Sequence, residues 1–491
     1  MKPRQTILGL ILFFGLSLSC STDYGTVEVY LVRSPNTEED PLDPARTTHI
    51  RIRVTGKGMA PQEGIFAFKE GGISTVPAIP IGNDRVITVE GLAGKDGYAI
   101  SRGRSLPIRI QEGSQRVELF VATIGRFSYT PGNGLTQARF AHTTAISKKG
   151  ELFVIGGAVT GSYETPLGQL DSIEIYHPGS GKTEYFTCGQ TSGNLCLKDP
   201  RAHAAGVLVP DGVLLLGGVG ENDLLDAIEL LDLELKALEA LKATAVPRQN
   251  AVVIHLGDQS LVAGGIDRDG GAVDVAELLN ADYKIEILNL GRKRRAMAAQ
   301  ASSQKGFLFG GFDENDELST EFLLFDPLTK QFSSHPIDVE SRAFAGAVPL
   351  SNGQVLVIGG LNANGEGSTA ISLFDPTLNR LCPLGDLKRG RWLHGAVKLP
   401  DGRVLVIGGL TGWDPGQPTP TVEILDPRFI KVGNSCGQIT GVLSISPGPD
   451  LRIPRFAATA SLLPNNVVAV VGGLDQNSNP INQIEVFVPD E

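Results

Sequence analysis

Apolar and polar residues alternate along most of the chain in a unit that recurs seven times. In each unit an apolar segment leads through a short polar turn into a second apolar segment that ends in a glycine pair. Turns such as PDGR and SNGQ supply the positive φ angles of a tight hairpin, so the two segments are predicted to be antiparallel strands, a and b. The glycine pairs are Gly156-Gly157, Gly217-Gly218, Gly264-Gly265, Gly310-Gly311, Gly359-Gly360, Gly408-Gly409 and Gly472-Gly473.

Two further segments follow each glycine pair. A third apolar segment, such as EFLLFDP or VEILDP, ends at a Pro because Pro cannot donate to a ladder. A weaker fourth segment, such as KTEYF or KQFSS, comes next. Four strands per unit, with 46 to 64 residues between glycine pairs, fit a propeller blade better than a helical repeat. The predicted fold class is all-β with a seven-bladed β-propeller, in which glycine permits close approach between crowded backbones.

An arginine lies sixteen or seventeen residues before each glycine pair, and a His follows it three residues later in RFAH and RWLH. These features resemble kelch repeats, and LPDGRVLVIGG is similar to the kelch propeller of galactose oxidase. The resemblance covers roughly residues 123–491. The Trp usual near the end of a kelch repeat is replaced by Phe186, Phe332 or Leu381. The arginines are Arg139, Arg201, Arg248, Arg294, Arg342, Arg391 and Arg455.

The chain closes the predicted ring by a strand from its other end. The sequence ends at Glu491, just after the third strand of the seventh unit. The segment 124–131, IGRFSYTP, precedes the first unit and resembles the fourth strands elsewhere, so it is predicted to complete blade seven. Such closure removes edges that would invite aggregation. Residues 224–244 read locally as an amphipathic helix, but the repeat register assigns them to two strands of blade two.

The first twenty residues resemble an export signal. Lys2 and Arg4 precede an apolar run from Ile7 to Leu18, and small residues lead to Cys20. The junction resembles a bacterial lipoprotein box, which implies a lipid on Cys20 and, with Ser21 after it, an outer-membrane lipoprotein facing the periplasm or the cell surface. The alternative is an ordinary secreted protein in which Cys20 is incidental. Residues 21–122 carry short alternating strands without glycine pairs, which predicts an immunoglobulin-like β-sandwich.

Composition and charge restrict the partners. Gly accounts for 60 of 491 residues and aromatics for 6%, which fits many turns and slender strands. The formal charge is −11, and an acidic balance without a basic block argues against nucleic acid. The four cysteines after Cys20 allow three pairings in an exported protein. The favoured pairing joins Cys188 to Cys196 and Cys382 to Cys436, which take similar places in adjacent blades.

Two recurring side chains are candidate site residues. His142, His203 and His394 lie fourteen residues before a glycine pair, a position taken by Asn250, Ala296, Ala345 and Ala458 in the other blades. They are interpreted either as a metal site or, preferably, as repeat residues satisfied within the fold. The arginines either pair with the glutamates that recur on strand c or form an anion-binding ring. The glutamates are Glu174, Glu229, Glu277, Glu423 and Glu485.

Cofactor chemistry finds little support in the sequence. Galactose oxidase holds copper through two tyrosines and two histidines, and this set has no counterpart here. The Asp- and Asn-rich loops IDRDGG, FDENDE, LNANGE and LDQNSNP are read as Asx turns rather than calcium loops, because none completes a calcium-binding pattern. No cofactor or metal is therefore predicted.

The long b-to-c and d-to-a loops should share one face, and recognition usually sits on such loops. The d-to-a set is taken to include the Cys188 to Cys196 loop and the stretch from Gly433 to Pro454. Trp413 is the preferred binding residue, because aromatic side chains dominate hot spots and sugar stacking, although it equally fits a role in packing on its own blade. Tyr163, Asp414 and Arg391 complete the candidate set. The predicted function is non-catalytic binding of protein or glycan, with an oxidase- or epimerase-like enzyme acting on carbohydrate as the alternative.

Overall fold

The computed structural model describes residues 24–34, 40–68, 79–132, 134–189, 195–413 and 415–490. Cys20 and Asp414, two of the candidate residues, lie outside these ranges. Apart from one 3-10 turn, η2 (Cys436–Gln438), every regular element in the described ranges is a strand. Within the same ranges, no helix has the length and apolar character needed to cross a membrane.

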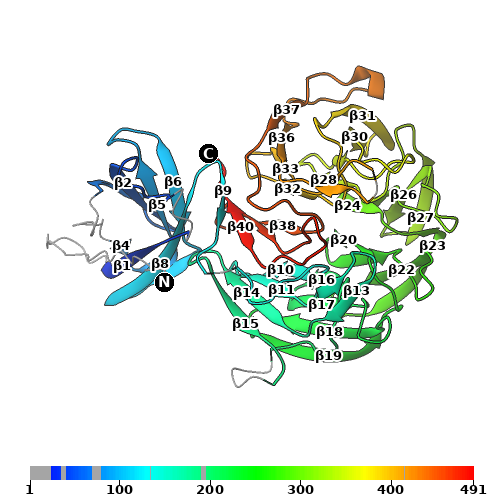
Figure 1. Cartoon of the computed structure of the whole chain (residues 1–491), viewed down its shortest axis with the longest axis horizontal. Helices are drawn as coiled ribbons and strands as arrows, with labels where there is room; N and C mark the ends of the chain where they lie inside the picture. Colours follow the sequence, from blue (N-terminus) through cyan, green and yellow to red (C-terminus); the bar gives the residue numbers. More distant parts are fainter. Residues whose placement is uncertain are drawn as a thin grey trace.

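Seven four-stranded antiparallel sheets are arranged in a ring around a central axis (Figure 1). The first strands of successive blades contact one another, so strand a is innermost. Blade one contains β10 (Thr143–Ile146), β11 (Leu152–Ile155), β14 (Ile173–His177) and β15 (Lys182–Phe186). Blade two contains β16 (Ala205–Val209), β17 (Gly212–Leu216), β18 (Ala227–Asp232) and β19 (Ala237–Thr244). Blade three contains β20 (Val252–Leu256), β21 (Gln259–Ala263), β22 (Val273–Leu279) and β23 (Ile285–Arg294). Blade four contains β24 (Ala298–Ser302), β25 (Lys305–Phe309), β26 (Glu321–Asp326) and β27 (Gln331–Pro336). Blade five contains β28 (Gly346–Pro349), β29 (Val355–Ile358), β30 (Ala370–Asp375) and β31 (Arg380–Asp386). Blade six contains β32 (Gly395–Lys398), β33 (Val404–Ile407), β36 (Val422–Asp426) and β37 (Ser444–Pro447).

Blade seven combines the two ends of the propeller sequence. It contains β38 (Thr459–Leu462), β39 (Val468–Val471), β40 (Ile484–Phe487) and β9 (Phe127–Tyr129). The outer strand β9 precedes blade one in the chain and pairs antiparallel with β40. The side chain of Phe127 is 1% exposed and its ring centroid lies 5.3 Å from that of Phe487. The ring is therefore closed by hydrogen bonds between segments more than 350 residues apart in sequence.

The glycine pairs join each blade to the next. A Cβ on Gly408, whose φ is +60°, would lie 2.6 Å from the carbonyl oxygen of Arg455 in blade seven. The backbone N–H of Gly409 donates to that same oxygen at 2.9 Å. The corresponding bond recurs in all seven blades, including from Gly473 of blade seven to Arg139 of blade one. The close approach that requires glycine is thus to the backbone of the neighbouring blade.

Blade two confirms that the repeat register outweighs local propensity. Residues 224–244 contain β18 and β19, which pair from Ala227 to Thr244, and the helical interpretation is wrong for this segment. Leu231 is fully buried between blades, and Leu238 packs against the same cluster. A helix would remove both outer strands of the blade, so tertiary pairing determines the structure here.

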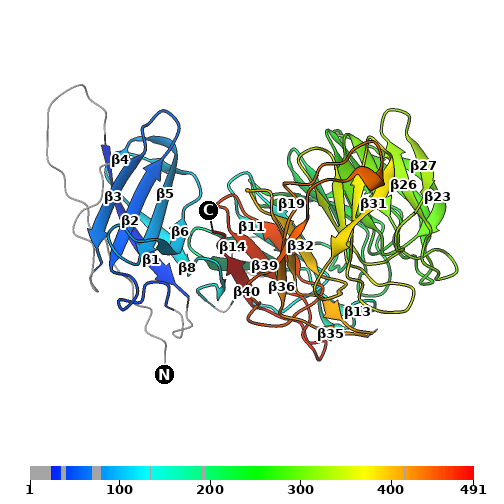
Figure 2. The same ribbon diagram turned by 90° about the horizontal axis from the view of Figure 1, so that it is seen from above.

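The N-terminal domain is also all-β. Its strands are β1 (Tyr24–Arg33), β2 (His49–Thr55), β3 (Gln62–Ala67), β4 (Ile79–Pro80), β5 (Gly82–Leu92), β6 (Ala99–Arg104), β7 (Ile108–Ile110) and β8 (Ser114–Thr123). They are linked in the order β3-β2-β5-β6-β8-β1-β4, with β7 paired to β5 and with β1 parallel to β8. A core of Val, Ile and Leu lies between the strands. Figure 2 shows this domain beside the propeller, next to β14 and β40.

Candidate functional site

One face of the propeller carries the long connections. We call the b-to-c loops, together with the d-to-a connections, the long-loop face. Two b-to-c loops form hairpins of their own: β12 (Ala158–Gly161) pairs with β13 (Pro166–Gln169) in blade one, and β34 (Leu410–Thr411) pairs with β35 (Gln417–Pro418) in blade six. Figure 2 shows β13 and β35 on the same side of the ring.

The centre of this face is built from a strained residue in every blade. Two residues after the arginine that recurs in each blade, the chain adopts a left-handed conformation with φ between 49° and 56°. In each blade, the residue directly after the arginine forms an isolated β-bridge with the residue directly after the glycine pair, as Trp392 does with Leu410. Because the left-handed residue recurs in all seven blades, it is a structural feature of the turn that leads into strand a. The residues are Ala141, His203, Asn250, Ala296, Phe344, Leu393 and Ala457.

Apolar side chains fill the middle of this ring. Phe140, Trp392, Leu410, Phe456 and Leu474 are buried in one cluster that draws on several blades. Partly buried residues pack against the cluster, and these are Ala141, Tyr163, Phe312, Phe344, Leu393 and Ala457. The centre of the long-loop face is therefore an apolar, aromatic surface.

Tyr163 reaches across this centre from blade one. Its ring lies edge-on to His203 of blade two at 4.8 Å and to Phe344 of blade five at 6.2 Å. Its hydroxyl contacts the Oδ1 of Asn250 in blade three at 3.5 Å, and its carbonyl accepts from the Nε2 of His203 at 2.6 Å. Contacts with three other blades make Tyr163 part of the floor of the face. The sequence predicts Tyr163 as a binding residue, and the structure places its side chain half-buried at the centre of the face.

Trp413 stands on the rim and is 64% exposed, so it does not fold back onto its own blade. Its backbone is held by a bridge to Glu366 in the blade-five loop, and Gly367 donates to the Gly412 carbonyl at 3.0 Å. Leu167, on β13 of the blade-one hairpin, is 58% exposed and was missed in the sequence. Two supported hairpins thus present large apolar side chains to solvent on one face.

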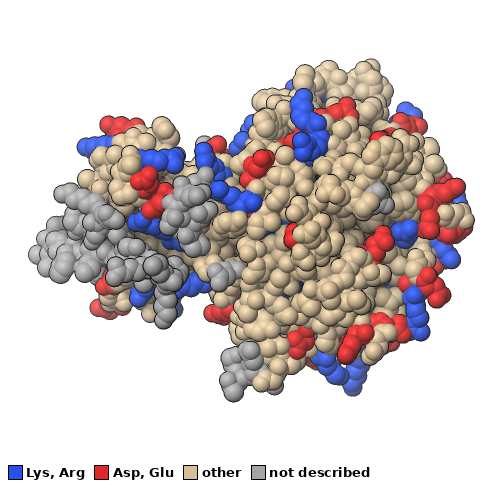
Figure 3. All heavy atoms as spheres, viewed as in Figure 1, with Lys and Arg blue, Asp and Glu red and all other residues tan. Residues whose placement is uncertain are grey.

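Acidic residues predominate in the b-to-c loops of this face. The seven b-to-c loops contain fourteen Asp and Glu residues and one basic residue, Arg268. Arg268 is already paired with Asp223 of the neighbouring loop. Figure 3 shows a broad uncharged area over the middle of the propeller, with most charged side chains toward its edge. The b-to-c loops therefore place a surplus of negative charge beside an apolar centre.

The Asp- and Asn-rich loops are Asx turns. Asp267, Asp313, Asn362 and Asp475 each accept from the backbone N–H two and four residues later, at 2.8 to 3.1 Å. One side-chain oxygen in each loop is therefore used by the loop itself. The interpretation as Asx turns agrees with this geometry.

The recurring arginines lie inside the blades. Arg391 is fully buried and donates to Glu423 at 2.9 Å, to the Gly408 carbonyl at 3.0 Å and to the Thr421 carbonyl at 2.7 Å. The same pairing joins Arg139 to Glu174 at 2.7 Å, Arg201 to Glu229 at 2.5 Å, Arg455 to Glu485 at 2.5 Å, and Arg248 to Glu277. Arg391 is therefore not available to a ligand, which corrects its prediction as a binding residue, and these five arginines form ion pairs within the blades rather than an anion-binding ring.

The three histidines do not occupy one structural position. Counting back from the glycine pair aligns them, but strand pairing places Ala204 opposite Gly217, where His142 and His394 stand opposite their own glycines. His203 instead has φ +54° and belongs to the central ring. The hairpin of blade two is shorter, because Val209 pairs with Gly212 whereas Ile146 pairs with Leu152 in blade one. The structural equivalents in blades three and four are likewise Ala251 and Met297, not Asn250 and Ala296.

Burial keeps these histidines neutral. Desolvation lowers the pKa of His142 to about 3, with Arg139 adding to the effect. Desolvation also lowers the pKa of His203 to about 4, against a smaller opposing effect of its bond to the Tyr163 carbonyl. The pKa of His394 falls to about 3 through burial and the nearby Arg391 and Arg342. His142 faces Thr459 of blade seven at 2.9 Å, so the histidines serve contacts between blades.

We expect the free energy of unfolding to fall as pH drops from about 6.5 toward 3. In this range the histidines bind protons in the unfolded chain but stay neutral in the folded chain. His142 and His203 are each 8% exposed, and each contributes a slope of about 1.4 kcal/mol per pH unit between pH 6.5 and its own folded pKa, about 3 for His142 and about 4 for His203. His203→Asn places the residue that blade three has at this point of the ring, and Asn tolerates the left-handed conformation. Urea unfolding at pH 7, 5.5 and 4.5 should give a shallower pH slope for this variant than for wild type. An unchanged slope would contradict the prediction, and His49→Asn on the N-terminal domain is the control.

Two disulfides fix loops away from the aromatic centre. Cys188 is bonded to Cys196, and Cys382 is bonded to Cys436. The second bond ties β31 of blade five to the residues between β36 and β37 of blade six. These residues, 427–443, connect strand c to strand d, so the first part of the stretch from Gly433 to Pro454 lies on the face opposite to the one expected. The sequence misplaces it because the c-to-d turns of the other blades are short.

A small polar group beside the first disulfide does not make a metal site. Asp171, Cys188 and Cys196 lie within ligand distance of one another. Both sulfurs are consumed by the disulfide, and the Asp171 carboxylate accepts from the Thr187 hydroxyl at 2.8 Å. A disulfide sulfur is not the thiolate that binds zinc. Asp171 therefore helps to fix the loop.

Comparisons with known proteins find a likeness of structure alone. No protein-family model matches it, and no curated protein matches it. Among solved structures, one described as "Structure of YjhT" is similar over 64% of this chain and 98% of that chain, with 13% identity and a TM-score of 0.44. A match at this level says nothing about function. The seven-bladed propeller itself is consistent with the kelch-type repeat that the sequence resembles.

Proposed function

We propose that this protein is an exported, non-catalytic binding protein that uses the long-loop face to hold a protein partner with a basic surface. The observation that carries the proposal is the surplus of acidic residues in the b-to-c loops beside the aromatic centre, fourteen against one basic residue. Complementary charge speeds encounter and excludes acidic partners, while apolar side chains supply the contact energy. Trp413 and Leu167 are the proposed anchors, with Asp414 beside Trp413.

A glycan is the second candidate partner. The support for it is the exposed indole of Trp413, since aromatic faces stack on sugar rings. An uncharged glycan would gain nothing from the acidic b-to-c loops, so its binding would be insensitive to salt. Salt dependence therefore separates the two partners.

The enzyme alternative has weaker support. A carbohydrate-active site at the centre of this face would need groups that exchange protons near neutral pH. Burial raises the pKa of Tyr163 to about 12, with Glu164 adding to the effect, and burial lowers the pKa of His203 to about 4. Neither group changes its charge near pH 7. We therefore favour binding over catalysis.

The proposal includes export and membrane anchoring through a lipid on Cys20, with the N-terminal domain as an immunoglobulin-like spacer. The two disulfides support an oxidising compartment, because such bonds rarely persist in the cytosol. Changing Cys20 to Ala tests the anchor, since an anchored protein should then leave the membrane fraction. A kelch-type assignment of the repeats belongs to the same proposal.

Trp413→Ala is expected to weaken binding of a basic, Leu-containing peptide about tenfold or more without changing the melting temperature. The measurement is biolayer interferometry against that peptide and an acidic peptide of equal length, at low and high salt, together with a glycan array. Phe429→Ala is the matched control, because Phe429 is 67% exposed on the opposite face of blade six. Equal affinity of wild type and Trp413→Ala would remove this anchor. Salt-insensitive glycan binding would instead favour the second candidate.

A further inference from the structure

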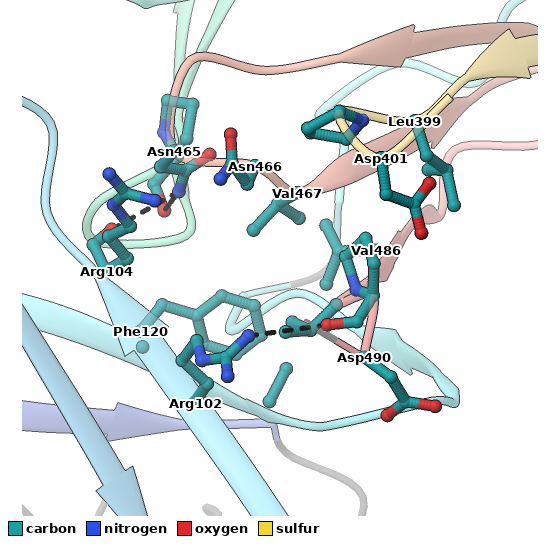
Figure 4. Close-up of a pocket in the computed structure, with 16 residues that line it drawn as sticks. Arg102, Arg104, Phe120, Leu399, Asp401, Asn465, Asn466, Val467, Val486 and Asp490 are labelled. Atoms are coloured by element: carbon teal, nitrogen blue, oxygen red, sulfur yellow. Dashed lines mark hydrogen bonds between the residues drawn. The ribbon is translucent and has the colours of Figure 1, made fainter. Parts of the chain in front are cut away.

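A cavity of about 70 Å³ lies at the junction between the N-terminal domain and the propeller. Strands β6 and β8 form one side of it (Figure 4). The other side consists of a turn from each of blades one, six and seven, together with the end of the chain after β40. The cavity is independent of the long-loop face, because the turns that line it lie on the opposite side of the blades.

The walls of the cavity are mainly apolar. Phe120 from β8, Leu399 from blade six, and Val467, Val486 and Val488 from blade seven line it. Figure 4 shows Phe120, Val467 and Val486 around one space, with Asp490 directed away from it. The volume is several times the roughly 15 Å³ that one water molecule needs, and apolar walls offer water few partners. The space fits the apolar part of a small molecule.

Two arginines of β6 border the cavity and differ in their use. Arg102 is paired with Glu90 at 2.9 Å and donates to the Pro489 carbonyl at 3.4 Å, so it joins the two domains. Asn465 also joins them, because its Nδ2 donates to the Arg104 carbonyl at 3.3 Å and to the Pro178 carbonyl at 3.5 Å.

Arg104, unlike Arg102, does not use its guanidinium to join the two domains. In the described part of the chain its guanidinium has no hydrogen-bond or ion-pair partner, and its side chain is half-buried beside Asn465 (Figure 4). At the other end of the cavity, the charge of Asp401 is compensated by Arg403 at 2.5 Å. An unpaired guanidinium beside an apolar space favours an anion, and its planar fork matches a carboxylate.

We propose that this cavity binds a small apolar carboxylate, with the carboxylate on Arg104 and the hydrocarbon chain against Val467, Val486 and Phe120. The volume has room for about four or five water-sized groups, which suits a short hydrocarbon chain. Because residues from both domains line the cavity, the ligand also stabilises their contact, and bound ligand raises the melting temperature of the whole chain.

Pentanoate is the probe, titrated into the purified full chain by calorimetry. Pentanol has the same chain without the charge, pentylammonium reverses the charge, and acetate lacks the chain. Pentanoate should bind about tenfold or more tightly than pentanol, since hydrogen bonds to charged groups contribute at least that much, and the other two probes should not bind. Arg104→Met should remove the preference for pentanoate over pentanol, whereas Arg109→Met, an exposed arginine of the same domain, should leave it intact.

Filling the cavity provides a second variant. Val467→Trp should abolish binding of pentanoate, with circular dichroism and the melting temperature showing that the chain is folded. If this variant does not fold, Arg104→Met alone decides the question, because it changes only an unpaired side chain. Failure of pentanoate to bind, equal affinity for pentanol, or an unchanged affinity in Arg104→Met would overturn the proposal. Tighter binding of palmitate than of pentanoate would also overturn it. Loss of the basic-peptide interaction has no bearing on these outcomes, because the two sites share no residue.

Discussion

Arg391→Met is expected to lower the free energy of unfolding by about 3–5 kcal/mol, because removing one partner of a buried ion pair leaves the other charge uncompensated. Glu423 is 4% exposed, and it would keep only the backbone N–H groups of Lys388 and Arg389, at 2.7 and 3.2 Å. The substitution would also release the carbonyls of Gly408 and Thr421, which end strand b and begin strand c. Urea unfolding followed by circular dichroism measures the loss.

The chain offers its own test of which partner matters more. Blade five has Ser372 where blade six has Glu423, and Arg342 there donates to the Ser372 hydroxyl at 3.0 Å and to the Ala370 carbonyl. Burial lowers the pKa of Arg342 to about 10 in the absence of a buried carboxylate partner, yet the arginine is retained. Glu423→Ser should therefore cost less than Arg391→Met. Arg380→Met breaks an exposed pair with Asp338 and should leave stability unchanged. A Glu423→Ser loss equal to or greater than that of Arg391→Met would contradict the account.

The repeat could be predicted from sequence because its constraints are local and recur. Each glycine pair meets the carbonyl of the following blade's arginine, so both features must appear once per blade at a nearly fixed distance. The glutamates of strand c recur for the same reason, since each pairs with the arginine of its own blade. Seven repetitions in register were enough to fix the blade boundaries, and they correctly outweighed the helical pattern of residues 224–244.

The candidate site was less accessible to sequence reasoning because it depends on contacts between blades. Tyr163 lies in a polar, Gly-containing loop, and its burial comes from His203, Asn250 and Phe344, which are distant in sequence. Distances counted from the glycine pair shifted the histidine alignment by one residue, because hairpin length differs between blades. The cavity at the domain junction had no sequence signal, since it forms only where turns from three blades meet β6 and β8.

A chain that starts at Gly134 is expected to melt markedly lower than one that starts at Thr123 and to aggregate on concentration. The shorter chain lacks β9, so the backbone groups of β40 that face it lose their ladder partners, as at Val486 opposite Ser128 and at the Ile484 carbonyl, which accepts from Thr130. An open, apolar strand edge is a template for pairing with another molecule. Loss of the Phe127 side chain also removes a buried aromatic group from the core between blades six and seven, a change that typically costs about 3–5 kcal/mol.

The comparison isolates the effect of β9, because both chains lack the N-terminal domain. Both also keep Thr136 and Gln137, whose N–H groups donate to Glu174. Differential scanning calorimetry and light scattering measure the two expected effects. A Phe127→Ala substitution in the full chain should reproduce the loss of stability but not the aggregation, since the ladder of β9 with β40 remains. Adding a synthetic peptide of residues 123–131 to the shorter chain should restore part of the melting temperature. Equal melting temperatures for the two truncated chains, with both monomeric, would show that the ring is held by the contacts between its inner strands and that β9 only covers its edge.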